Sequence, residues 1–235
     1  MSYLKQTTIA IISAIALVSC GPHIQGDGNV VKKEHDISNV NKLDINGQFR
    51  VILTQGKKSR LSIETDENLH DYITVVNKEN TIRIGTEAFI TDAEKLNIYV
   101  TMPHFNDIDL SGAVELTNDK KIKTKSMRID ASGATEIDLD MEIKELSIDL
   151  SGASEIKLQG SARNAEFDLS GASEIEAYEF ETENMIIEIS GAGNAEVFVT
   201  ETLDVEISGA GEVKYKGEPE IDDDISGAGN IEKVK

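Results

Sequence analysis

The chain has 235 residues, of which 39% are hydrophobic, and its formal net charge at pH 7 is −20. This length and apolar content suffice for one or two domains with a buried core, while the negative charge argues against a nucleic-acid partner, because phosphate binding needs a basic surface. The single cysteine excludes an intrachain disulfide, and the absence of tryptophan predicts a largely aliphatic core.

Residues 1–19 have the order of a secretory signal, with the positive Lys5 followed by an apolar run over residues 9–18. The sequence Leu-Val-Ser-Cys that ends at Cys20 resembles a bacterial lipobox, in which the cysteine becomes the lipidated first residue of the mature protein. A plain signal peptide with an incidental cysteine is the alternative, but Cys20 is the only cysteine and lies where a lipobox requires it. We therefore expect an exported protein, anchored by its lipid to the bacterial cell envelope, with the outer membrane as the expected location.

Residues 20–28 contain several glycines and are expected to form a short flexible tether. Residues 29–105 show strand patterns without a strict repeat, a short helical segment at residues 67–73, and a hairpin that turns at residues 77–80. We expect this β-rich region to cap the first unit of the repeats that follow.

The tripeptide Ser-Gly-Ala occurs seven times within residues 106–235, at intervals of 18 to 21 residues. A period near 20 is typical of stacked repeats, in which each unit covers the apolar face of its neighbour. Apolar and charged residues alternate on both sides of each copy, as in strands with one buried and one exposed face. We expect the glycine of each copy at a corner with positive φ or close contact between coils; these glycines are Gly112, Gly133, Gly152, Gly171, Gly191, Gly209 and Gly227.

Apolar residues also recur at fixed positions relative to the repeat serines, one position before each serine and five positions after it. Fixed apolar columns indicate identical positions stacked coil over coil, about 4.8 Å apart. The sequence therefore predicts an all-β fold with a parallel β-solenoid over residues 106–235. An antiparallel meander of hairpins is the alternative, and it is disfavoured because its successive copies would run in opposite directions.

An acidic residue stands two positions before every repeat serine, and we call this set the acidic column: Asp109, Asp130, Asp149, Asp168, Glu188, Glu206 and Asp224. In stacked coils, neighbouring charges in this column would repel one another by roughly 1 kcal/mol in water. The column is interpreted either as a solvated acidic face or as a site for divalent cations such as Ca²⁺. The solvated face is favoured, because the glycine-rich nonapeptide that binds Ca²⁺ in other solenoids is absent, and no other cofactor is expected.

The chain resembles one known family in four features: the lipobox, residues 43–51 with Gly47, the early hairpin, and the Ser-Gly-Ala-Gly-Asn copies at Ser190 and Ser226. It is described as "putative auto-transporter adhesin, head GIN domain", and it contains secreted or lipid-anchored bacterial proteins. The resemblance extends from about residue 43 to the C-terminus. It implies a right-handed single-stranded β-helix and carries no catalytic residues that could be transferred to this chain.

The sequence contains no recognisable catalytic arrangement. No histidine follows His104 that could serve as a base for the repeat serines, and the four histidines lack metal-ligand spacing. We expect an adhesin-like binding or structural module without catalytic activity, directed at an unknown ligand outside the cell or in the envelope. The alternative is a carbohydrate-binding or carbohydrate-active β-helix protein, which a groove lined by polar and aromatic side chains would indicate.

The lipid anchor can be tested by replacing Cys20 with serine. Cys20→Ser is expected to release or mislocalise the protein, because the acyl chains on this residue would be its only attachment to a bilayer. Metabolic labelling with a fatty-acid probe, followed by fractionation, measures both effects. Equal labelling of the wild type and the variant would show that Cys20 is not the acylation site.

Overall fold

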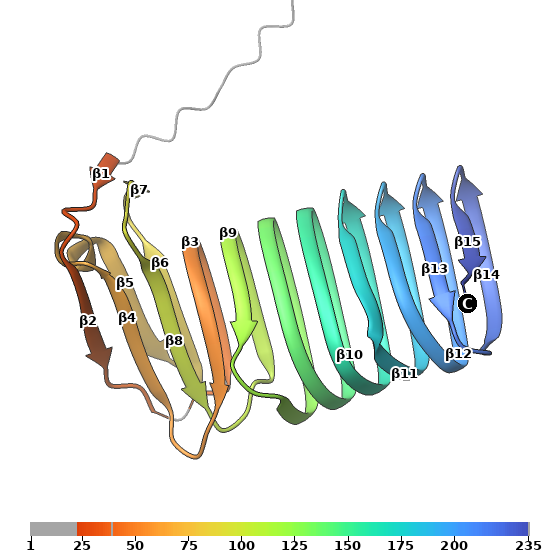
Figure 1. Ribbon diagram of the computed structural model, residues 1–235, viewed down its shortest axis with the longest axis horizontal. Coiled ribbons are helices and arrows are strands. Elements are labelled where there is room, and N and C mark those ends of the chain that lie inside the picture. Colours follow the sequence, from red (N-terminus) through yellow and green to blue (C-terminus); the bar gives the residue numbers. More distant parts are fainter. Residues whose placement is uncertain (1–22, 39, 235) are drawn as a thin grey trace, which may run out of the picture.

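The computed structural model describes residues 23–38 and 40–234, so the expected signal segment 1–19 and Cys20 lie outside the described residues. The described part is all-β, as the sequence predicts, and it forms an elongated stack of strands along one axis (Figure 1). Its one helix is the 3-10 helix η1 (Glu67–Tyr72), which confirms the short helical segment expected there. Within the described residues, no helix has the length and apolar character needed to cross a membrane.

Eight strands precede the repeats: β1 (His23–Gln25), β2 (Val30–His35), β3 (Lys42–Gln55), β4 (Arg60–Asp66), β5 (Ile73–Lys78), β6 (Thr81–Thr86), β7 (Phe89–Thr91) and β8 (Leu96–Met102). The repeats form seven more: β9 (Asp107–Asn118), β10 (Ile122–Gly171), β11 (Glu174–Gly191), β12 (Asn194–Gly209), β13 (Glu212–Lys216), β14 (Glu220–Gly227) and β15 (Asn230–Lys233). The 50 residues of β10 include two complete copies of the tripeptide, at Ser132 and Ser151, and end within a third, at Gly171. The strand therefore continues past Gly133 and Gly152, although both glycines have positive φ.

Neighbouring repeats pair in parallel and in register. Ser132 of β10 faces Ser111 of β9, and Ser190 of β11 faces Ser170 of β10. The same register continues from β11 through β12 to β14, and the successive turns lie side by side in Figure 1. This parallel pairing excludes the antiparallel meander.

The N-terminal region continues the stack beyond the first repeat. Gly47 of β3 faces Gly112 of β9, so residues 43–51 form a further unit of the same kind. Next to β3 lies the parallel strand β8, followed by the antiparallel strands β4 and β2, while β5 and β6 form the predicted hairpin. Together with the repeats, these strands make one mixed 13-stranded sheet that is not closed.

The core is mainly aliphatic, as the composition predicts, and it runs through the whole stack. The residue before each of the first six repeat serines is buried: Leu110, Ala131, Leu150, Leu169, Ile189 and Ile207. The corresponding Ile225 in the last copy is only partly buried, because no further repeat covers it. Three aromatic side chains, Phe105, Phe167 and Phe180, are fully enclosed within this aliphatic core.

The two ends of the stack differ. At the N-terminal end, the edge strand β2 carries the exposed Lys32 and Lys33. At the other end, among the described residues, no element covers β14 and β15. Asp223 of β14 pairs with the buried Val205 of β12, so a charge occupies a column that is apolar in the preceding repeats. Charges at such positions oppose the addition of another chain to an open strand edge.

The expectation of a flexible tether over residues 20–28 is wrong from His23 onward. β1 pairs in parallel with β7 and forms a separate two-stranded sheet. The buried carboxylate of Asp66 accepts hydrogen bonds from the backbone N–H of Gly28 at 2.6 Å and of Glu94 at 3.0 Å. A buried carboxylate needs such donors, and the sequence did not show that Asp66, far away in the chain, would supply this contact.

The repeat glycines bring neighbouring backbones into direct contact. All seven have positive φ, between 95° and 152°, and the carbonyl oxygen of Gly152 accepts a 2.9 Å hydrogen bond from the N–H of Ala172 in the next repeat. A Cβ atom on Gly171 would lie 2.5 Å from that same carbonyl oxygen. A side chain at this position would therefore strain the backbone and collide with the preceding coil.

We predict that Gly171→Val costs about 4 kcal/mol of unfolding free energy or more, because conformational strain and a backbone clash add together. Gly85→Ala is a matched control, since its Cβ would meet its nearest atom at 3.5 Å without positive φ. Glu176→Gln is a surface control that loses only an exposed pair with Lys157. Denaturant melts measure all three, and coincident transitions for Gly171→Val and either control would contradict the role assigned to the glycine.

Candidate functional site

The structure brings the acidic column together along one face of the stack. Asp130 faces Asp109, and the register continues through Glu188, Glu206 and Asp224. Asp149 lies close enough to Asp130 and Asp168 for their charges to raise its pKa. Asp44 of β3 extends the column by one position toward the N-terminus.

Basic side chains compensate the N-terminal half of the acidic column. Arg128 forms an ion pair with Asp130 at 2.8 Å and reaches Asp149 at 3.7 Å. Arg83 binds Asp44 at 2.6 Å, and Lys42 pairs with Asp107 beside the column. For Asp168, Glu188, Glu206 and Asp224, by contrast, the described residues supply no ion pair. The negative potential of this face is therefore strongest toward the C-terminal end.

Sequence reasoning missed these cations for two reasons. Lys42 and Arg83 belong to the irregular N-terminal region, whose register with the repeats is set by the tertiary fold. Arg128 was detectable, because it precedes Asp130 by two residues and both therefore point to the same face of the strand.

Two carboxyl groups of the column have a pKa above the ordinary aspartate value. For Asp109, partial burial raises the pKa, followed by the charges of Asp107, Asp130 and Asp44. For Asp149, partial burial again comes first, followed by the charges of Asp168 and Asp130, and the attraction of Arg128 only partly offsets them. The folded chain therefore holds these two protons more tightly than the unfolded chain does.

Asp107, Asp109 and Asp130 also form the cluster most similar to a metal site. Each offers one carboxylate oxygen within 4.8 Å of the others. Lys42 and Arg128, however, already contact Asp107 and Asp130, so protein cations supply the charge that a metal ion would supply. Binding of Ca²⁺ by the column stays a prediction.

The repeat serines stabilise the corner between coils. Ser170 donates a hydrogen bond to the carbonyl of Leu150 at 3.1 Å, and Ser111, Ser132 and Ser226 make longer bonds of the same kind to the preceding coil. Because these hydroxyls are engaged with backbone oxygens, their role here is structural.

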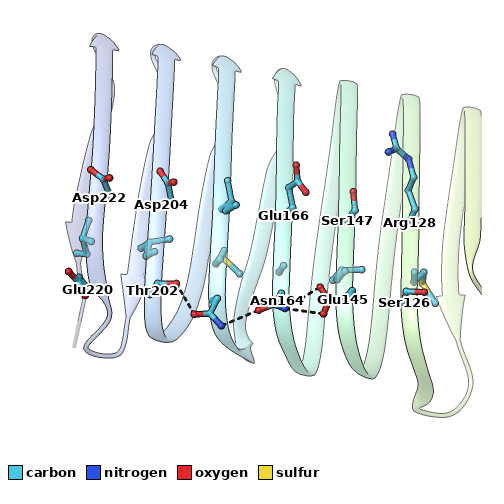
Figure 2. A pocket seen from close by; sticks show the side chains of 18 of the residues that line it. Ser126, Arg128, Glu145, Ser147, Asn164, Glu166, Thr202, Asp204, Glu220 and Asp222 are labelled. Carbon is cyan, nitrogen blue, oxygen red and sulfur yellow. Dashed lines mark hydrogen bonds between the residues drawn. The ribbon is translucent and has the colours of Figure 1, made fainter.

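Beside the acidic column, a groove of about 980 Å³ crosses the stack from β10 to β14 (Figure 2). Two rows of outward-facing side chains border it. One row contains Arg128, Ser147, Glu166, Ile186, Asp204 and Asp222, and the other contains Ser126, Glu145, Asn164, Asn184, Thr202 and Glu220. Leu146 and Leu203 between the rows are nearly fully buried, whereas Ile186 and Ile221 are exposed, so the groove presents apolar surface as well as polar groups.

Side chains of the second row form a continuous chain of hydrogen bonds, which we call the amide row. Thr202 donates to the Asn184 carbonyl oxygen at 2.8 Å, and Asn184 donates to the corresponding oxygen of Asn164 at 3.0 Å. Asn164 in turn donates to both carboxylate oxygens of Glu145. One polar group therefore follows the next along four neighbouring coils, and each amide retains hydrogen-bonding capacity toward the groove.

No single motif of the sequence marks this groove. The polar residues that stand six positions before the repeat serines, however, indicate a polar row along the stack; among them are Asn164, Asn184 and Thr202. The bordering rows contain five acidic residues and one basic residue, Arg128. The groove is therefore suited to a neutral or positively charged ligand that is long enough to contact several coils.

The charge of the column predicts a dependence of stability on salt and pH. Because the pKa of Asp149 is raised in the folded state, its ionisation lowers stability above that pKa. The double replacement Asp149→Asn and Asp168→Asn is expected to raise the melting temperature at pH 7 and low salt by about 2–4 °C. The part of this melting-temperature difference that comes from Asp149 should vanish below about pH 3.9, where its carboxyl is protonated in both the folded and the unfolded chain.

Added NaCl should raise the melting temperature of the wild type and reduce the difference from the double variant, since the Debye length falls from about 30 Å at 0.01 M to about 10 Å at 0.1 M. If the column binds Ca²⁺, millimolar Ca²⁺ should stabilise the wild type beyond a NaCl control of matched ionic strength. Asp138→Asn removes an exposed charge outside the column and is the matched control. Melts that are insensitive to salt, Ca²⁺ and the double replacement would contradict repulsion along the column.

Comparisons with known proteins agree with this geometry. A crystal structure of a "putative adhesin" from Bacteroides fragilis NCTC 9343 has a TM-score of 0.83 at 25% identity, over 90% of this chain and 100% of that chain. A "putative lipid binding protein" from Parabacteroides distasonis ATCC 8503 has a TM-score of 0.73 at 25% identity, over 91% and 100%. No curated protein matches. The family model described as "Putative auto-transporter adhesin, head GIN domain" matches residues 39–219, and the chain therefore belongs to this family.

Proposed function

We propose that the protein is a lipid-anchored module of the cell envelope that binds an extended ligand along its groove without catalysing a reaction. The observation that carries this proposal is the amide row, in which Glu145, Asn164, Asn184 and Thr202 are linked from coil to coil. An ordered row of polar groups at the spacing of the coils is suited to a ligand with its own repeating polar groups. The adhesin family of the chain is consistent with such a role.

The proposed architecture is a right-handed, single-stranded β-solenoid with a β-rich cap. Parallel pairing of successive repeats in register supports it, because each turn of such a solenoid lies on the preceding one. This architecture gives the groove its regular spacing of about 4.8 Å between coils.

The residues that border the groove support a binding role over a catalytic one. They include no histidine and no cysteine, and the hydroxyl of Thr202 is engaged with Asn184. A nucleophile would need a base within hydrogen-bond reach, and the bordering residues present none beyond carboxylates. Lipidation at Cys20 would hold this binding face at the envelope, and the outer membrane is the proposed location.

A carbohydrate is the second candidate ligand. The amide and hydroxyl groups of the amide row favour it, since they can donate to and accept from sugar hydroxyls. No aromatic side chain borders the groove, however, so stacking against sugar rings would contribute nothing. Acidic polysaccharides are disfavoured, because Glu166, Asp204 and Asp222 would repel them.

A glycan array that includes neutral, amino-bearing and acidic polysaccharides tests whether the extended ligand is a carbohydrate. Binding to neutral or amino-bearing polymers is expected, and Asn164→Ala together with Asn184→Ala should weaken it by about tenfold or more, because hydrogen bonds to the ligand are lost. Glu176→Gln lies outside the groove and should leave binding unchanged. Equal binding by the groove variant and the control would show that the amide row is not the contact surface.

A further inference from the structure

The two-stranded sheet of β1 and β7 forms a distinct tip at the N-terminal end of the molecule, next to the point where the chain enters the described structure (Figure 1). His23 faces Phe89 across the pair, and their ring centroids are 5.1 Å apart. Ile90 points the other way and is buried, while Phe89 is 46% exposed. The tip therefore exposes the aromatic pair of His23 and Phe89 on one face, whereas its other face packs inward through Ile90.

The tip is held firmly on the cap. Within the tip, the N–H of Gly26 donates to the carbonyl of Thr91; the side chain of Asn68, in η1 of the cap, donates to the carbonyl of Gln25 at 2.8 Å. The N–H of Gly28 donates to buried Asp66. Contacts of this kind leave the segment after β1 little freedom to move away from the cap.

The position of the tip follows from chain length. Cys20 precedes His23 by three residues, and three residues span at most about 11 Å even when fully extended. A headgroup layer is about 5–8 Å thick on each side of the hydrocarbon core. A lipid on Cys20 would therefore hold the tip at the depth of the headgroups or directly above them.

We infer that the β1–β7 tip contacts the surface of the phospholipid bilayer that holds the lipid on Cys20, with Phe89 entering the interfacial layer. This inference rests on the proposed lipid anchor. Zwitterionic headgroups are the expected partner, because Glu87 and Asp92 flank the tip and disfavour a strongly anionic surface. The charge distribution agrees: after the expected signal segment, residues 20–105 have 10 basic and 12 acidic side chains, whereas residues 106–235 have 12 and 31. The strongly acidic repeats are thus the less favourable part to place on a membrane.

The absence of tryptophan gives a direct test, because Phe89→Trp introduces the only indole of the chain. The full chain, acylated in its bacterial host, is reconstituted into phosphatidylcholine–phosphatidylethanolamine vesicles, and fluorescence quenching by brominated phospholipid is measured. Ile186→Trp is the matched control, since Ile186 has a similar exposure of 43% on a repeat strand far from the tip. The inference requires a blue-shifted emission and several-fold stronger quenching for Phe89→Trp than for Ile186→Trp.

Fatty-acid labelling of the same preparation separates the two proposals. Labelled protein with equal, weak quenching at both positions would overturn the tip contact and leave the anchor intact. Protein that carries no label would overturn the anchor and, with it, the tip contact. Circular dichroism checks that both variants retain the β structure, which is expected because each replacement lies at an exposed position.

Discussion

The close contact between glycine backbones of neighbouring repeats is the constraint on which the rest of the structure depends. Each repeat glycine lies directly against the glycine before it, and in the last four repeats the carbonyl there accepts a hydrogen bond from the alanine N–H of the next repeat. Only a residue without Cβ permits this distance at positive φ. Because the contact recurs at one point of every coil, it fixes the register of all the other positions in the repeat.

A fixed register gives each face of the stack a uniform chemistry. The apolar positions become a continuous core, whereas the polar positions become the acidic column and the amide row. Uniformity has opposite consequences for the two polar faces, since amides can bond to one another and carboxylates repel one another. Among the described residues, Arg83 and Arg128, which pair with the column, and Lys42, which pairs beside it, relieve the repulsion at the N-terminal end, so negative charge accumulates toward the open end.

The ends of the stack serve different purposes. The N-terminal end is covered by antiparallel strands and extended by the β1–β7 tip, close to the proposed anchor. The C-terminal end shows no covering element among the described residues, and the inward position of Asp223 opposes pairing with another chain. With the proposed anchor at its N-terminal end, the module would keep the groove, which runs from β10 to β14, open to the proposed ligand.

The sequence by itself determined the strands, the parallel stacking and the position of the repeat glycines, because a period near 20 and the alternation of apolar and charged residues are local patterns. The acidic column was predictable for the same reason. Only the tertiary structure decided which side chains meet across coils: Arg128 with Asp149, Asn184 with Asn164, and Asp66 with Gly28. These contacts join residues 20 to 38 positions apart, and their partners depend on how each repeat lies on the next, which no local pattern records.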